Sequence, residues 1–193
     1  MMRKLYDWTI HWSKTKYASY SLFLLAFAES SFFPIPPDVL LLAMTVAHRF
    51  KWWFFALIST LGSVLGGIAG YFIGLFFFQA IGQPIVDFYH LQTAFDQVGV
   101  LYKENAFLAV FTAAFTPIPY KVFTIGGGFF QIPLEQLIIA SLFGRAARFF
   151  AVAGAIRIFG RRISNAIEKY FDIASLIFMA FLIGGFLIIK FLS

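Results

Sequence analysis

The sequence predicts an all-α integral membrane protein: an inverted repeat of an amphipathic helix, a re-entrant helical hairpin and a transmembrane helix, followed by a C-terminal transmembrane helix. Composition is the first observation behind this prediction. Of the 193 residues, 61% are hydrophobic and 12% are charged, with a mean hydropathy of +0.83, whereas soluble domains carry about 25% charged residues. Apolar stretches long enough to enter a bilayer also recur along the chain, and prolines interrupt two of them.

Composition also excludes several classes of function. Cysteine is absent, so the chain offers neither disulfides nor thiolate metal ligands. The histidines His11, His48 and His90 lack a metal-ligand spacing, and no hydrolase or P-loop motif occurs. We therefore expect residues 1–193 to form one membrane domain that is not an enzyme and needs no cofactor or metal. The net charge of +6 fits membrane sidedness better than nucleic-acid binding.

The N-terminal segment predicts an amphipathic helix over residues 1–17. Leu5, Trp8 and Trp12 recur at helical spacing on one face, and basic residues lie around them. Such a helix lies at the level of the lipid headgroups, with aromatic rings as anchors. The alternative is a frayed tail.

Residues 18–47 predict the first re-entrant hairpin. The stretch is apolar, but Pro34, Pro36 and Pro37 interrupt it. Prolines remove backbone donors and force extended geometry on the residues before them. The second arm, residues 39–47, reaches only about 14 Å at 1.5 Å per residue, against a hydrocarbon core of about 30 Å. The chain is therefore expected to enter and leave the membrane on one side.

Residues 52–81 are the clearest transmembrane segment. Small residues recur at every fourth position, at Gly62, Gly66, Gly70 and Gly74. Such a stripe lets another helix backbone approach closely, so we expect it to serve helix packing. A substrate-lining role is the alternative.

The second half of the chain repeats this plan. Residues 84–105 are mixed in polarity and predict a surface helix or helix pair. Residues 106–130 predict the second re-entrant hairpin, broken at Pro117 and Pro119. Residues 134–156 predict the next transmembrane helix, because they are long and apolar enough to span.

Two further segments follow. Residues 157–171 predict a basic amphipathic stretch, in which Arg157, Arg161 and Arg162 would anchor the chain to anionic lipid. Residues 173–192 have an ordinary apolar composition and predict the final transmembrane helix.

The distribution of basic residues supports re-entrant hairpins. If both proline-containing segments return to the side they entered from, most basic residues fall on one face of the membrane. These are Arg3, Lys4, Lys14, Lys16, Arg49, Lys51, Arg157, Arg161, Arg162 and Lys169. The positive-inside rule makes that face cytoplasmic, and the N-terminus lies there too.

Two short motifs resemble those of a known family. They are Glu29-Ser-Ser-Phe-Phe-Pro34-Ile-Pro36-Pro37-Asp38 and Phe115-Thr-Pro117-Ile-Pro119-Tyr-Lys121, followed by glycines at Gly126 to Gly128 and by Gly144-Arg145. Together they resemble the DedA family, also called VTT or SNARE-associated membrane proteins, and within it the shorter YqaA-like branch. The resemblance covers residues 17–156.

The resemblance implies two facing re-entrant hairpins that move lipids across a plasma membrane, which in bacteria is the inner membrane. Undecaprenyl phosphate and phosphatidylethanolamine are substrates proposed for bacterial relatives, and eukaryotic relatives look like phospholipid scramblases. Members of the main branch have Arg-Phe-x-Pro-x-x-Arg. Here Ala114 stands where the first Arg would be, and Lys121 stands where the second Arg would be. This motif therefore keeps one cation of a natural phosphate clamp.

Charged residues at membrane depth are the candidates for the site. Each costs about 2.5–3.5 kcal/mol or more, which makes them functional candidates by default. Glu29 and Asp38 would respond to protons or cations, or they would cap half-helices. Lys121 would bind a lipid phosphate, or it would pair with one of these carboxylates. Arg145 would be a second phosphate ligand or the partner of an acidic residue, and Arg148 would snorkel toward the cytoplasm.

These residues lead to one main hypothesis and two alternatives. The main hypothesis is a transporter, a flippase or scramblase, that moves a phosphate-bearing lipid such as a phospholipid or a polyprenyl phosphate. Its partners would be membrane lipids and, if transport is coupled, protons or cations, without nucleic acid. The alternatives are a small-ion or proton antiporter, and a non-catalytic scaffold with a dimer face on the stripe from Gly62 to Gly74, which leaves a homo-oligomer open.

Overall fold

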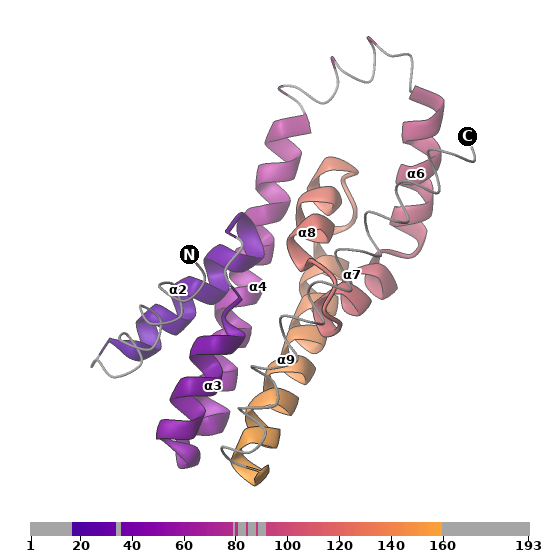
Figure 1. The fold of residues 1–193 in the computed structure, drawn as a ribbon. Coiled ribbons are helices and arrows are strands. Elements are labelled where there is room, and N and C mark those ends of the chain that lie inside the picture. The colour runs from indigo at the N-terminus through magenta and orange to yellow at the C-terminus, as the bar shows by residue number, and fades with distance from the viewer. Residues whose placement is uncertain are drawn as a thin grey trace, which may run out of the picture.

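The computed structural model describes residues 17–33, 36–78, 80, 84, 88 and 92–159. Every element in this part of the chain is a helix (Figure 1). In chain order the elements are α2 (Ala18–Ser31), α3 (Asp38–Ala47), the 3-10 helix η1 (Arg49–Lys51), α4 (Trp52–Phe77), α6 (Gln92–Glu104), α7 (Ala106–Phe115), α8 (Tyr120–Phe129) and α9 (Leu134–Phe159). Several predictions fall outside the described residues: the helix at 1–17, Pro34, Arg161, Arg162, most of the segment at 157–171 and the transmembrane helix at 173–192.

Two long helices, α4 and α9, form the centre of the fold. Each has 26 residues, which is about 39 Å at 1.5 Å per residue and exceeds a hydrocarbon core of about 30 Å. Both are long and apolar enough to span a membrane. They run antiparallel and side by side, as Figure 1 shows. Within the described residues, a third span results only if the segment Asp96–Glu104 of α6 and α7 are counted together as one bent helix.

The ends of these two helices refine the predicted spans. Helix α4 begins at Trp52 as predicted, and its α-helical part ends at Phe77. Helix α9 begins at Leu134 as predicted but continues to Phe159, past the expected end at residue 156. Arg157 therefore lies in the last turn of α9, not in a separate segment. A cation is favourable there because it complements the negative end of the helix dipole.

Two helix–break–helix units, α2–α3 and α7–α8, accompany the long helices. The described prolines of the two motifs lie in the breaks, as predicted: Pro36, Pro37, Pro117 and Pro119. Helix α7 ends at Phe115, two residues before Pro117, and α8 begins at Tyr120. The reason is that Pro119, which is extended and precedes the first helical residue, offers its carbonyl to the Val122 N–H at 3.0 Å. The helix therefore starts directly after the proline.

Each unit packs at a different end of the α4–α9 pair. The first apolar core joins α2 and α3 to the start of α4 and the end of α9, through Ala18, Leu22, Leu40, Leu41, Met44, Phe55, Ala56, Phe149 and Ala153. The second core joins α7 and α8 to the end of α4 and the start of α9, through Tyr71, Ala106, Val110, Ala113, Ala114, Tyr120, Ile132, Leu137 and Ala140. The long helices thus hold the two units at opposite ends.

The glycine stripe of α4 is covered inside the chain. Gly62 and Gly66 lie against α2, where a Cβ on Gly62 would come within 2.5 Å of the Phe23 carbonyl oxygen and one on Gly66 would strike the Phe27 carbonyl. Gly70 and Gly74 lie mainly against α8. The geometry therefore shows that the glycine stripe serves helix packing. The dimer-face and substrate-lining alternatives are wrong for this stripe, because α2 and α8 occupy it.

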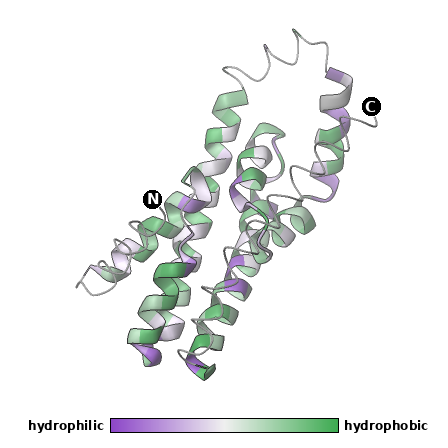
Figure 2. Ribbon diagram, in the orientation of Figure 1, coloured by the Kyte–Doolittle hydropathy of each residue, from purple (hydrophilic) through white to green (hydrophobic). Residues whose placement is uncertain are grey.

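Helix α6 differs from the other helices in polarity. Figure 2 shows polar and apolar residues mixed along α6, whereas α3 and α4 are mostly apolar. Helix α7 follows after a single residue, Asn105, and bends away by 76° from the preceding segment Asp96–Glu104. A helix of this polarity at such an angle fits the predicted surface helix, of which the structure describes the part from Gln92 onward.

Basic residues gather where α9 ends. The Arg157 guanidinium lies 5.5 Å from the ring of Trp52, the residue that directly follows η1. The exposed side chains of Arg49 and Lys51 therefore lie at the same end of the helix pair as Arg157. The positive-inside rule predicts these three residues on one side of the membrane, and they lie at one end of the helix pair.

Adding a methyl group to the stripe should destabilise the fold. For Gly66→Ala and Gly74→Ala we expect a loss of about 1–3 kcal/mol, because the new Cβ meets backbone carbonyls that cannot move away. Thermal unfolding of the detergent-purified protein measures the effect.

The matched control is Gly126→Ala on α8. A Cβ there meets nothing closer than Tyr102 Cε1 at 3.8 Å, so the higher helix propensity of Ala should leave stability equal or slightly raised. Stripe variants that melt together with this control would contradict the packing role.

Candidate functional site

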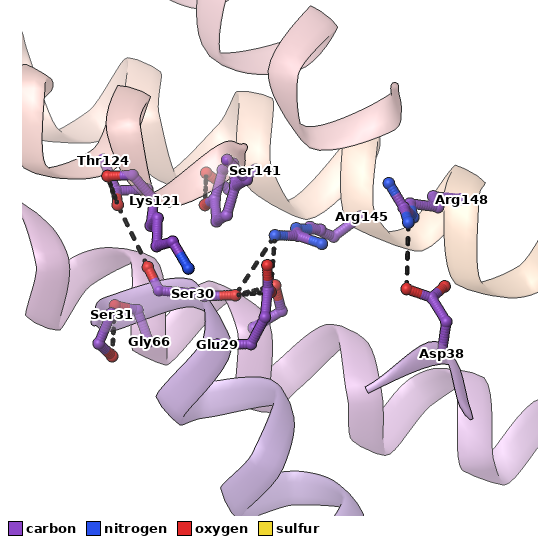
Figure 3. A network of polar contacts seen from close by, with 12 residues as sticks. Glu29, Ser30, Ser31, Asp38, Gly66, Lys121, Thr124, Ser141, Arg145 and Arg148 are labelled. Carbon is purple, nitrogen blue, oxygen red and sulfur yellow. Dashed lines mark hydrogen bonds and ion pairs between the residues drawn. The ribbon is translucent and has the colours of Figure 1, made fainter. Parts of the chain in front are cut away.

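Glu29 and Arg145 form a buried ion pair between α2 and α9. Arg145 Nη2 donates to Glu29 Oε2 at 3.1 Å, and the two side chains are 3% and 17% exposed, respectively. The guanidinium also lies over two rings, 4.1 Å from the centre of Tyr120 and 5.6 Å from that of Phe149. Arg145 is therefore placed as the partner of an acidic residue, which is one of its two predicted roles. Figure 3 shows this pair beside Ser30.

Asp38 and Arg148 form a second ion pair, one turn further along α9. Arg148 Nη2 donates to Asp38 Oδ2 at 3.0 Å, and Nη1 donates to the Thr116 carbonyl at 2.8 Å. The prediction that Arg148 snorkels toward the cytoplasm is wrong, because these acceptors hold it inside the protein. Asp38 is not a side-chain cap either: Pro37 is the N-cap of α3, and no side chain caps that helix.

Lys121 connects the two breaks without an ion pair. It is the second residue of α8, and its Nζ donates to the Phe33 carbonyl at 3.1 Å. The predicted alternative of a pair with Glu29 or Asp38 is wrong, because both carboxylates are held by arginines of α9. The Lys121 side chain is partly exposed and makes its bond to a neutral acceptor. Among the described residues, the Lys121 ammonium is therefore not paired with a carboxylate.

Buried hydroxyl groups join neighbouring helices close to the ion pairs. Ser30 and Ser63 share a hydrogen bond of 2.7 Å between α2 and α4, and the Thr124 hydroxyl donates to the Ser30 carbonyl at 3.2 Å. The Tyr120 hydroxyl donates to Ser141 Oγ at 2.5 Å. All of these residues are buried. Buried hydroxyls need partners, so each bond fixes one helix against another.

Sequence reasoning did not identify these hydroxyls or the role of Arg148. A signal existed for both. Ser30 directly follows Glu29 in an apolar helix, and Arg148 follows Arg145 by three residues, which places the two arginines on the same helix face. Of the predicted lipid anchor, Arg157 is exposed at the end of α9, and the other two arginines lie beyond the described residues.

These features define a helical, multi-pass membrane protein in which two ion pairs hold the first broken-helix unit against α9. The chain belongs to the VTT domain family, the DedA family: the sequence model of the VTT domain matches residues 35–158, well over half of the chain. An uncharacterised protein of Haemophilus influenzae is 34% identical over 169 residues, 88% of each chain. One of Histophilus somni is 32% identical over 77% of each chain.

A more distant relative comes from an archaeon. An uncharacterised protein of Methanocaldococcus jannaschii is 26% identical over 132 residues, which are 68% of this chain and 79% of that protein. No solved structure matches.

Membership of the family sharpens the comparison of the second motif. Counted along the chain, Arg-Phe-x-Pro-x-x-Arg beginning at Ala114 ends at Tyr120, and Lys121 lies one residue beyond. The assignment of Lys121 to the second Arg position is therefore off by one residue. The position itself carries the ring on which the Arg145 guanidinium lies.

Removing one partner of the ion pair between Glu29 and Arg145 should lower the free energy of unfolding more than removing both partners. Glu29→Gln leaves the Arg145 charge buried without a counter-charge, which costs about 3 kcal/mol or more. Combining Glu29→Gln with Arg145→Met removes both charges and should recover part of that loss. A double-mutant cycle on the unfolding free energy in detergent measures the coupling.

Glu135→Gln is the matched control, because Glu135 is exposed in the first turn of α9. It should unfold like the wild type. Equal stability of Glu29→Gln and Glu135→Gln would show that the pair does not stabilise the fold.

Proposed function

We propose that this protein moves a phosphate-bearing lipid, a phospholipid or a polyprenyl phosphate, across the bilayer. The observation that carries the proposal is the gathering of charged groups around the two breaks. Glu29 and Asp38 come from the first unit, Lys121 from the second, and Arg145 and Arg148 from α9. Charges at this depth are costly and mark substrate or ion pathways. Membership of the VTT domain family supports a membrane transporter.

The proposed architecture is an inverted repeat of re-entrant hairpins. The packing of the helices supports it: α2 lies on α4 as α7 lies on α9, while α3 contacts α9 as α8 contacts α4. Each helix after a break thus lies on the long helix of the other half. Transporters with broken helices bind substrate and coupling ions where such halves meet, near the bilayer midplane.

In the proposed mechanism, Lys121 takes the lipid phosphate. Its ammonium is a point charge with several donors, and it lies in the first turn of α8, where the helix dipole also favours an anion. A phosphate accepts stronger hydrogen bonds from a cation than a backbone carbonyl does, so it displaces the Phe33 carbonyl. Arg145 contributes positive charge behind this position while Glu29 holds it in place.

The proposed location is the plasma membrane, the inner membrane of a bacterium, with the N-terminus in the cytoplasm. The basic residues Arg49, Lys51 and Arg157, which share one end of the α4–α9 pair, support this orientation through the positive-inside rule. Glu29 and Asp38 are the groups through which protons or cations would act, since neutralising either carboxylate would release an arginine.

Lys121→Ala should slow lipid movement at least about tenfold, which corresponds to about 1.4 kcal/mol in the barrier. The measurement uses purified protein in liposomes that carry a headgroup-labelled phospholipid, with a parallel set that carries a polyprenyl phosphate. Lys103→Ala, an exposed lysine of α6, is the matched control and should move lipid like the wild type.

The same vesicles separate this proposal from an ion antiporter. If the wild type moves labelled lipid no faster than empty liposomes, with or without a proton gradient, lipid transport is excluded. Cation-driven proton flux, read by a pH-sensitive dye inside those vesicles, would then identify the antiporter.

A further inference from the structure

Arg148 lies where three helices meet. Its Nη1 donates at 2.8 Å to the carbonyl of Thr116, which caps the C-terminus of α7 at the second break. Its Nη2 donates at 3.0 Å to Asp38, the first residue of α3 after the first break. One guanidinium on α9 therefore ties the end of one broken helix to the start of another.

Lys121 forms a second tie between the breaks. From the first turn of α8 it reaches the Phe33 carbonyl, two residues after the end of α2. Each tie thus places a cation at the C-terminal end of a half-helix, α2 or α7, where orphan carbonyls and the negative end of the helix dipole favour it. The two ties hold the breaks close to one another from both directions.

The two arginine side chains differ in how deeply they are buried. The Arg145 side chain is 3% exposed and stacks on Tyr120 and Phe149. The Arg148 side chain is 20% exposed and that of Asp38 is 10% exposed. Arg148 can therefore exchange its acceptors for water or a ligand at lower cost than Arg145, because its charge is not fully removed from solvent.

We infer that Arg148 is a positioning residue that holds the two breaks together, and that its tie must open during transport. The inference rests on the proposed function and adds the step that follows phosphate binding. A phosphate on Lys121 removes the tie to Phe33. Arg148 then still restrains the breaks, beside the hydrogen bond from Thr124 to the Ser30 carbonyl. A ligand shifts the equilibrium between closed and open breaks only by its higher affinity for the open state. The strength of the Arg148 tie therefore sets how readily the breaks part.

Because the sequence contains no cysteine, two introduced cysteines can carry spin labels that report the distance between the breaks. Phe33→Cys and Phe115→Cys place spin labels on side chains that are 39% and 49% exposed, one at each break. Pulsed electron paramagnetic resonance in liposomes then reads the distance between the breaks. In the labelled background we expect a main short distance, and Arg148→Gln should raise the longer-distance fraction about tenfold, the change that about 1.4 kcal/mol produces.

Two further variants make the comparison specific. Arg148→Lys keeps the charge but lacks the planar fork that serves two acceptors at once, so it should give an intermediate distribution. Arg49→Gln removes an exposed cation of η1, at the opposite end of α3 from the first break, and should leave the distribution unchanged. Adding dihexanoyl phosphatidic acid should shift the labelled background toward the Arg148→Gln distribution, while dihexanoylglycerol and inorganic phosphate should not.

The rate of lipid movement distinguishes this role from a merely structural one, because losing a purely structural contact would slow lipid movement. If Arg148 restrains the breaks, Arg148→Gln moves labelled lipid faster than the wild type, even where its melting temperature falls. An unchanged distance distribution in Arg148→Gln overturns the inference, and so does slower movement by a variant that remains folded. A wild type that moves no lipid refutes the proposed function and with it the opening step, while the distance measurement still decides whether Arg148 holds the breaks together.

Discussion

Burial of charge in an apolar bundle is the constraint on which the arrangement of the helices depends. A carboxylate or a guanidinium taken out of water is tolerated only when it finds an opposite charge or strong hydrogen bonds. Here both arginines lie on one face of α9, three residues apart, and both carboxylates flank the first break. These two pairs fix the rotation of α9 and its depth relative to the α2–α3 unit, because a shift of one residue would separate both at once.

Close backbone approach makes the remaining contacts short enough for small polar groups. Glycines on α4 bring α2 near, so that Ser30 reaches Ser63 and Ser31 reaches the Gly66 carbonyl at 3.1 Å. Without a hydrophobic force between helices in lipid, such close packing and interhelical hydrogen bonds are what hold a bundle together. The glycine stripe thus brings α2 and α8 onto α4, while the ion pairs hold α2 and α3 against α9.

The sequence predicted the parts of the fold that depend on local chemistry. Composition and length indicated the long helices, and the fixed geometry of proline marked the breaks at Pro36, Pro37, Pro117 and Pro119. It did not predict which charges pair, because Arg145 and Glu29 are 116 residues apart and periodicity shows only that each lies within an apolar helix. Arg148 was misjudged for the same reason, since snorkelling and pairing leave identical patterns in one helix.

The glycine stripe has a consequence for how this chain tolerates change. The first half of the stripe packs against α2 and the second half packs against α8. A single face of α4 therefore sets the rotation of the two units relative to each other. One residue inserted between Gly66 and Gly70 would rotate the halves by about 100° relative to each other. Each unit could still fold on its own half of the helix, but the breaks would no longer face one another. The four-residue spacing of the glycines in α4 thus determines how the two halves of the protein align.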